Sequence, residues 1–134
     1  MYGKIPNHDM HWIAGDSVNS SITYKVDGYT QNLQGYTVTM VVRLPEGETG
    51  SETTDTLIAT FSSGTGDFNI PSDTTGKINF TISPGKTRAL NPENLLMVPY
   101  VYALEVHKEG TEESLEVVKT LLRGKLYIYS EVAR

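Results

Sequence analysis

The chain has 134 residues, contains no cysteine and carries a formal charge of −5 at pH 7. This length is typical of one domain, and the missing cysteines exclude disulfides and a thiolate metal site. The acidic balance argues against nucleic acid, because phosphate binding needs a basic face. The sequence shows neither a membrane-spanning apolar run nor a secretory signal. We therefore expect a soluble protein that is made in the cytoplasm and has no membrane partner.

The first twelve residues, MYGKIPNHDMHW, are polar with scattered apolar side chains. They show no alternation of their own, so we predict an N-terminal arm over residues 1–12, followed by one domain over residues 13–134. An arm of this kind docks on a partner through its apolar anchors. The predicted anchors are Tyr2, Ile5, Met10 and Trp12. The alternatives are that Trp12 closes the bottom of the core, or that the stretch through HWIAG adds an edge strand.

The same arm holds the densest group of metal-ligating side chains in the sequence. His8, Asp9 and His11 offer two imidazoles and a carboxylate. A structural metal site needs more firm ligands than these, and none is identifiable nearby. We therefore predict no bound metal.

Alternation of apolar and polar residues predicts strands along the rest of the chain. It is clearest in residues 21–26, 36–44, 77–82 and 99–108 and weaker in residues 56–61, 114–122 and 124–132. In the second of these segments Val38, Met40 and Val42 share the face that we expect to be buried. Strands of this kind pair into half-buried sheets.

Helix signals are scarce, and a single short one follows the strand at 77–82. The stretch SPGKTRALNPENLL predicts a helical turn that begins at Ser83-Pro84 and ends before Pro92. Glycine, Asp, Asn and Ser cluster between the strands and indicate turns. We therefore predict an all-β fold, an immunoglobulin-like antiparallel β-sandwich of about seven to eight strands with one short helical turn. A closed barrel is the alternative.

No arrangement of catalytic residues is evident. The acidic stretches 46–55 and 109–116 lack the spacing of a calcium-binding loop. Asp16, Asp27 and Glu105 could in principle serve a glycosidase, but nothing in the sequence pairs them. We predict a non-enzymatic protein with no cofactor.

Tyr127 and Tyr129 form a second apolar face on the last predicted strand. They alternate with Leu126 and Ile128, so both faces of this strand need cover. The core covers one face, and either a neighbouring loop or a second protein chain covers the other. Both tyrosines are therefore predicted docking residues. Together with Trp12 they are also the candidates for stacking on sugar rings, which makes a carbohydrate-binding module the alternative function.

The order of four segments carries a resemblance to a known family. They are NLQGYTVTMVVRLP, GKINFTISPGKTRAL, YVYALEVHKEG and LLRGKLYIYSEVAR. In this order they resemble the immunoglobulin-like domains of tailed-phage structural proteins, including the N-terminal domain of the baseplate upper protein. The matching positions are Leu33, Gly35, Val42, Arg43, Gly76, Phe80, Ser83, Thr87, Leu90, Tyr100, Tyr102, Leu104, Glu105, Val106, Leu122, Gly124 and Val132.

This resemblance covers about residues 13–134 and implies a virion structural protein. The implied role is a tail, baseplate or head accessory subunit, such as a capsid decoration protein, that binds other virion proteins and forms a homo-oligomer or is present in several copies on the particle. The pattern includes no catalytic residue. The chain departs from it at Ala103, where an acidic residue is common, and at NPENLLMVP, which replaces a glycine.

Overall fold

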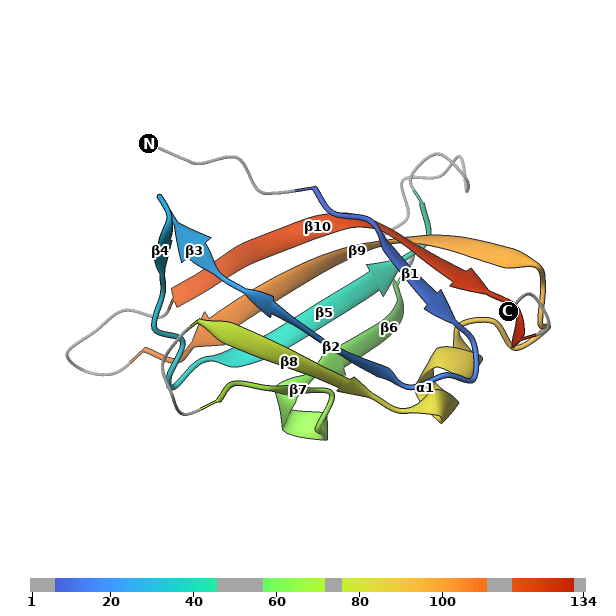
Figure 1. Cartoon of the computed structure of the whole chain (residues 1–134), viewed down its shortest axis with the longest axis horizontal. Helices are drawn as coiled ribbons and strands as arrows, with labels where there is room; N and C mark the ends of the chain where they lie inside the picture. The colour runs from blue at the N-terminus through green and yellow to red at the C-terminus, as the bar shows by residue number, and fades with distance from the viewer. Residues whose placement is uncertain (1–6, 46–56, 72–75, 111–116, 132–134) are drawn as a thin grey trace.

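The computed structural model describes residues 7–45, 57–71, 76–110 and 117–131 (Figure 1). Within these ranges the chain forms one larger and one smaller sheet. The larger sheet contains, in spatial order, β1 (Met10–Ile13), β10 (Val117–Tyr129), β9 (Met97–Lys108), β5 (Thr37–Arg43) and β6 (Leu57–Ser62). The smaller sheet contains β2 (Val18–Thr23), β8 (Lys77–Ile82) and β7 (Phe68–Asn69). A separate hairpin joins β3 (Lys25–Val26) to β4 (Tyr29–Thr30), and the helical segments are η1 (Ser63–Thr65) and α1 (Pro84–Ala89).

The core lies between the inner faces of the two sheets, and the predicted all-β sandwich is confirmed. Each long strand buries every second side chain, as a pleated strand must. The buried side chains include Val38, Met40, Val42, Ile78, Phe80, Ile82, Tyr100, Tyr102, Leu104, Val106, Leu126 and Ile128. The rings of Phe68 and Phe80 meet edge to face across neighbouring strands of the smaller sheet, with centroids 5.0 Å apart.

The larger sheet curls strongly around the core. Trp12 lies on β1 and Phe61 on β6, which are the two edge strands of this sheet. Their rings nevertheless meet edge to face, with centroids 6.0 Å apart. The indole of Trp12 therefore reaches across the core, although the described strands remain in separate sheets and do not close a barrel.

Two strand boundaries differ from those that the sequence predicts. Within the described residues, the segments predicted at 114–122 and 124–132 contribute to one strand, β10 over Val117–Tyr129, which carries a bulge between Thr120 and Leu122. Gly124 does not end a strand, since it lies opposite Tyr102 in the ladder. The segment at 21–26 is interrupted at Tyr24, whose N–H donates to the carbonyl of Gly76 rather than to a continuing ladder.

The helix α1 occupies the predicted turn, with Pro84 in its first turn and Leu90 as a buried C-cap. The main departure from an antiparallel sandwich is β1, which pairs with β10 in parallel, with His11 opposite Tyr127. Among the described residues, no helix combines the length and apolar character that crossing a membrane requires.

Candidate docking groove

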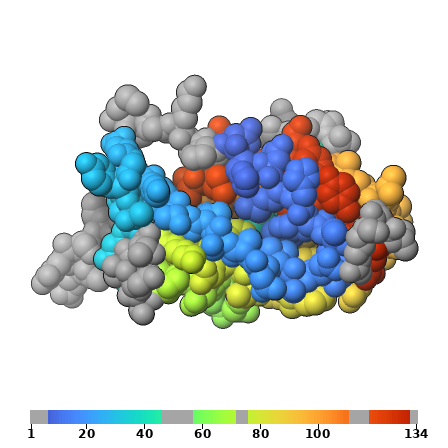
Figure 2. Space-filling model, viewed as in Figure 1, coloured from blue at the N-terminus to red at the C-terminus, as the bar shows by residue number. Residues whose placement is uncertain are grey.

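A groove of about 520 Å³ lies between β1 and β2. Figure 2 shows both strands, in blue, on the same face of the molecule. Within the described residues β1 pairs only with β10 and β2 pairs only with β8, so each is an edge strand of a different sheet. The groove is thus an open edge of the sandwich, flanked by two strands whose outer sides are unpaired.

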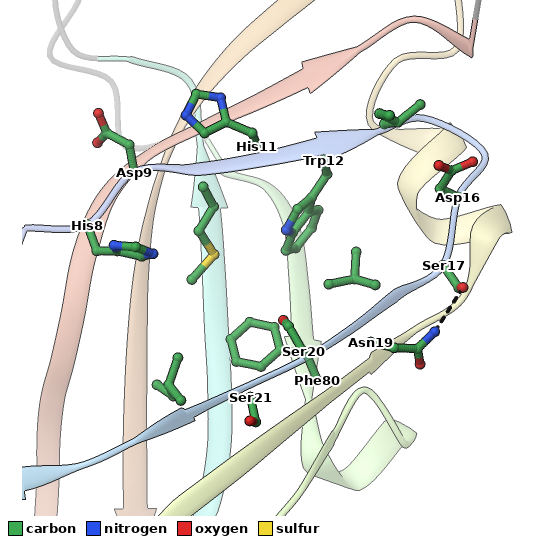
Figure 3. Close-up of a pocket in the computed structure, with 14 residues that line it drawn as sticks. His8, Asp9, His11, Trp12, Asp16, Ser17, Asn19, Ser20, Ser21 and Phe80 are labelled. Carbon is green, nitrogen blue, oxygen red and sulfur yellow. Dashed lines mark hydrogen bonds between the residues drawn. The ribbon is translucent and has the colours of Figure 1, made fainter. Parts of the chain in front are cut away.

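The groove lies over the apolar core, because a small side chain of β2 stands at its middle, but the core residues that line it are only 2–9% exposed. Val18, Ser20 and Ile22 alternate along β2 and share its inner face, and Ser20 lies opposite Phe80 in the ladder. Val18 and Ile22 are half-buried, whereas Ser20 is exposed despite its inward position. Its short side chain cannot fill the space above Phe80, and Figure 3 shows the two side by side. Met10 and Trp12 of β1 form the opposite wall.

Polar side chains stand at the rim of the groove. His8 lies just before β1, and Asp16 and Ser17 lie in the turn that follows it, whereas Asp9 and His11 point away from the groove, on the other side of the chain from Trp12 (Figure 3). The carboxylate of Asp9 accepts a hydrogen bond from the backbone N–H of Lys125 at 3.0 Å. The described part of the chain brings no three His, Cys, Asp or Glu side chains together in a group that could hold a metal ion.

Hydrogen bonds fix the chain at both ends of the groove. At one end the N–H of His8 donates to the carbonyl of Arg123 at 2.8 Å, and the hydroxyl of Tyr102 donates to the carbonyl of His8. Burial, with a contribution from the nearby Asp9, raises the pKa of Tyr102, so this hydroxyl keeps its proton at neutral pH.

At the other end the buried Thr87 of α1 holds the turn between β1 and β2. Its hydroxyl accepts a hydrogen bond from the N–H of Gly15 at 3.0 Å and donates one to the carbonyl of Asp16 at 2.8 Å. Thr87 is one of the positions that carry the family resemblance, and this contact gives it a structural role. The groove is therefore a fixed feature of the fold.

The structure corrects the expectation for the N-terminal anchors. Met10 and Trp12 are only 9% and 7% exposed, because alternation along β1 turns both side chains into the core. They therefore do not present the exposed anchors that the sequence suggests, and Trp12 closes the core as the alternative held. Residues 10–12 belong to β1, so the expected boundary between arm and domain falls inside a strand. Tyr2 and Ile5 lie outside the described residues.

Tyr127 and Tyr129 lie on the outer face of β10, where His11 packs on them. The imidazole stacks on the two rings at centroid distances of 5.1 and 5.8 Å. A hydrogen bond of 2.8 Å also joins His11 Nδ1 to the Tyr129 hydroxyl. Part of the cover for these tyrosines thus comes from β1 of the same chain, and both remain half-buried, so their role in docking stays a prediction. Sequence reasoning did not predict the contact of His11 with the two tyrosines, because only the parallel register of β1 brings the imidazole to them.

The carboxylates considered for hydrolysis come from separate elements. Asp16 lies in the turn after β1, Asp27 lies between β3 and β4, and Glu105 is half-buried on β9. The acidic stretch 46–55 and most of the stretch 109–116 lie outside the described residues.

No family model and no curated protein matches this chain. The fold and its open edge therefore carry the functional argument. They define a small β-sandwich with a groove between the edges of its two sheets.

Proposed function

We propose that this protein is a non-enzymatic structural subunit of a tailed-phage virion. It belongs to the tail, the baseplate or the head accessory layer, where it docks onto neighbouring virion proteins. The observation that carries this proposal is the β1–β2 groove, because two strand edges that are unpaired among the described residues suit the uptake of a segment from another protein by strand addition. The order of the four family-like segments supports the virion as its location.

The chemistry of the groove suits binding rather than catalysis. Its more exposed lining comes from β2, where the half-buried Val18 and Ile22 alternate with the exposed Ser20 and Ser21. A hydrolytic site would instead place acid and base on opposite sides of a bound substrate. A mixed apolar and polar lining is common at protein interfaces.

The experiment uses the exposed position of Ser20. Replacing it with Trp fills the groove without removing a buried side chain, so the variant should fold and its incorporation into virions should fall sharply. The matched control is Thr23→Trp, because Thr23 is exposed on the same strand but does not line the groove. Mass spectrometry of purified particles measures incorporation. Absence of the wild-type protein from the particles, or equal incorporation of both variants, would contradict the proposal.

The alternative, a carbohydrate-binding module, receives less support from the geometry. Trp12 is buried in the core, and the rings of Tyr127 and Tyr129 already stack on His11. A sugar ring would have to displace this imidazole to stack on both tyrosines. Saturable binding on a glycan array that Tyr127→Ala abolishes would favour the alternative.

A further inference from the structure

The outer face of the larger sheet carries an apolar stripe centred on β9. Tyr100, Tyr102 and Leu104 of this strand point into the core, so the residues between them point outward. Outward positions of a half-buried antiparallel strand are usually polar. On β9 they are apolar, and so are their outward neighbours on β5 and β10. We call the following residues the β9 stripe: Pro99, Val101, Ala103, Val41, Tyr127 and Tyr129.

The register of the sheet makes the stripe continuous. Ala103 lies opposite Val41 of β5, and Pro99 lies opposite Tyr127 of β10. Pro99 is exposed, whereas Val41, Val101 and Ala103 are half-buried. Single apolar side chains are common on protein surfaces, but a contiguous group of them often marks an interaction site.

Three cationic side chains flank the stripe. Arg43 of β5 and Lys125 of β10 lie opposite Val101, one on each side of it. Arg123 of β10 lies opposite Ala103. All three cations are exposed, and no described carboxylate forms an ion pair with any of them. Their charges are therefore available to a partner.

Two carboxylates border the same surface. Asp9 accepts a hydrogen bond from the backbone N–H of Lys125, and Glu105 occupies the next outward position of β9 after Ala103. Three cations against two carboxylates leave a positive balance around the stripe. The chain as a whole carries a formal charge of −5, so this surface is the part of the molecule that favours an acidic partner.

The size of the face is sufficient for a protein partner. β9 and β10 have 12 and 13 residues. At the usual rise and spacing of strands, the five-stranded sheet measures roughly 40 Å along these strands and roughly 20 Å across them. Its outer face is thus on the order of the 800 Å² that each partner contributes to a standard interface. The stripe suits the apolar centre of such an interface, and the cations suit its polar rim.

We propose that the β9 stripe, together with Arg43, Arg123 and Lys125, binds an acidic and partly apolar segment of another protein. Apolar side chains of the partner cover the stripe, and its carboxylates pair with the three cations. A nucleic acid fits this surface less well, because the stripe offers it no charge and a chain of net charge −5 repels a polyanion. The surface is separate from the β1–β2 groove, so the inference does not depend on what the groove binds.

The test is an NMR titration of the purified chain with a short soluble peptide that mixes Glu with Leu and Phe. Backbone amide signals of Val101, Ala103 and Lys125 should shift, and added salt should weaken the binding. A peptide with Lys in place of Glu, and another with Ser in place of Leu and Phe, should each bind about tenfold more weakly or worse. A single-stranded oligonucleotide should leave these signals unchanged.

Variants of the chain separate local from overall charge. Arg43→Glu combined with Arg123→Glu should weaken binding of the Glu peptide about tenfold or more. Lys25→Glu combined with Lys77→Glu is the matched control, because it changes the net charge equally at exposed lysines of β3 and β8. This control should bind like the wild-type protein.

A second pair of substitutions tests the apolar part of the surface. Val41→Thr combined with Val101→Thr keeps the β-branched shape of both side chains and should weaken binding about threefold or more. Circular dichroism checks that each variant keeps its fold.

Four results would overturn the inference: no shift at the stripe, equal binding of the Glu and Lys peptides, tighter binding of the oligonucleotide, or equal losses in the two charge variants. Sedimentation velocity covers a further possibility. If the wild-type chain self-associates and the Arg43→Glu, Arg123→Glu variant does not, a second copy occupies the stripe and the inference fails. Failure of the proposed function is distinguishable, since it is measured by incorporation of the Ser20→Trp variant into virions and leaves the stripe unchanged.

Discussion

Glycines at two positions are required for different physical reasons. At Gly124 a Cβ atom would collide with the backbone carbonyl of His8, which crosses β10 at that point. At Gly35 a Cβ atom would make only an ordinary contact with the Lys108 side chain at 3.7 Å, but the backbone has φ of 84°, a conformation that side-chain-bearing residues rarely adopt. Both glycines belong to the family-like pattern, and the local geometry explains why each position requires glycine.

Replacing either glycine with Val should therefore destabilise the fold. We expect the free energy of unfolding to fall by about 1–3 kcal/mol, through a steric clash at Gly124 and backbone strain at Gly35. Urea denaturation measures the loss. Gly85→Ala is the control, because a Cβ atom at Gly85 meets nothing within 4 Å and its φ lies outside the left-handed region. Unchanged midpoints for both Val variants would contradict the prediction.

The protonation of Asp67 makes the stability of the fold depend on pH. Burial raises the pKa of its carboxyl, but hydrogen bonds from Lys86, Thr65 and the backbone of Ser62, with the charge of Lys86, outweigh burial and lower it below the ordinary value of 3.8. The unfolded chain therefore binds this proton at higher pH than the folded chain does. The stabilisation is complete above the ordinary pKa and is lost as the pH falls through the folded pKa.

We expect the wild-type protein to lose more stability than Asp67→Asn when the pH falls from about 5 to 3. The Asn variant lacks the titrating group, so its curve should be flatter in this range, although its stability at neutral pH should be lower. Urea midpoints at several pH values measure the difference. Parallel curves for the two proteins would show that Asp67 does not carry the effect.

At the scale of elements, β1 decides whether the N-terminal residues can be removed. The sequence suggests that the domain folds without residues 1–11, but that deletion removes Met10 and His11, which pair with Leu126 and Tyr127 of β10. We expect this truncation to cost about 2–5 kcal/mol, because it exposes core that Met10 covers. Thermal unfolding measures the loss. Deleting residues 1–6 is the matched control, since it leaves β1 intact, and equal melting temperatures for the two truncations would contradict this role of β1.

The sequence predicts the long strands well and the short ones poorly. Alternation identifies β5, β8 and β9 because each runs for six residues or more with one buried face. The two-residue strand β7 offers no period to detect. The four-residue β1 gains its stability from β10, more than a hundred positions away, so local pattern cannot assign it. The groove depends on how β1 and β2 lie relative to each other in space, which the sequence pattern does not reveal. In the sequence, His8, Asp9 and His11 stand out as metal-ligand candidates and Trp12 as a docking anchor, not as residues that line a groove.

At the scale of the molecule, one core serves both sheets, and Phe80 lies near its centre. The ring is 2% exposed and packs against Phe68. Phe80→Ala should cost about 3–5 kcal/mol, a large share of the 5–15 kcal/mol that stabilises an ordinary domain. Chemical denaturation measures the loss. Phe80→Leu, which keeps most of the apolar volume, should lose less, and a Phe80→Ala variant that melts within a degree or two of the wild type would contradict the position of the core.

The parallel pairing of β1 with β10 has a consequence for how the protein is made. Met10 leaves the ribosome before its partner Leu126, which emerges more than a hundred residues later. During synthesis the nascent chain can form local hairpins such as β5–β6, but the edge of the larger sheet stays incomplete until β10 appears. Closing so long a loop is entropically costly, so we expect the attachment of β1 to be a late folding step. Until then Trp12 has no complete core to enter, and the unattached β1 segment exposes the emerging chain to aggregation.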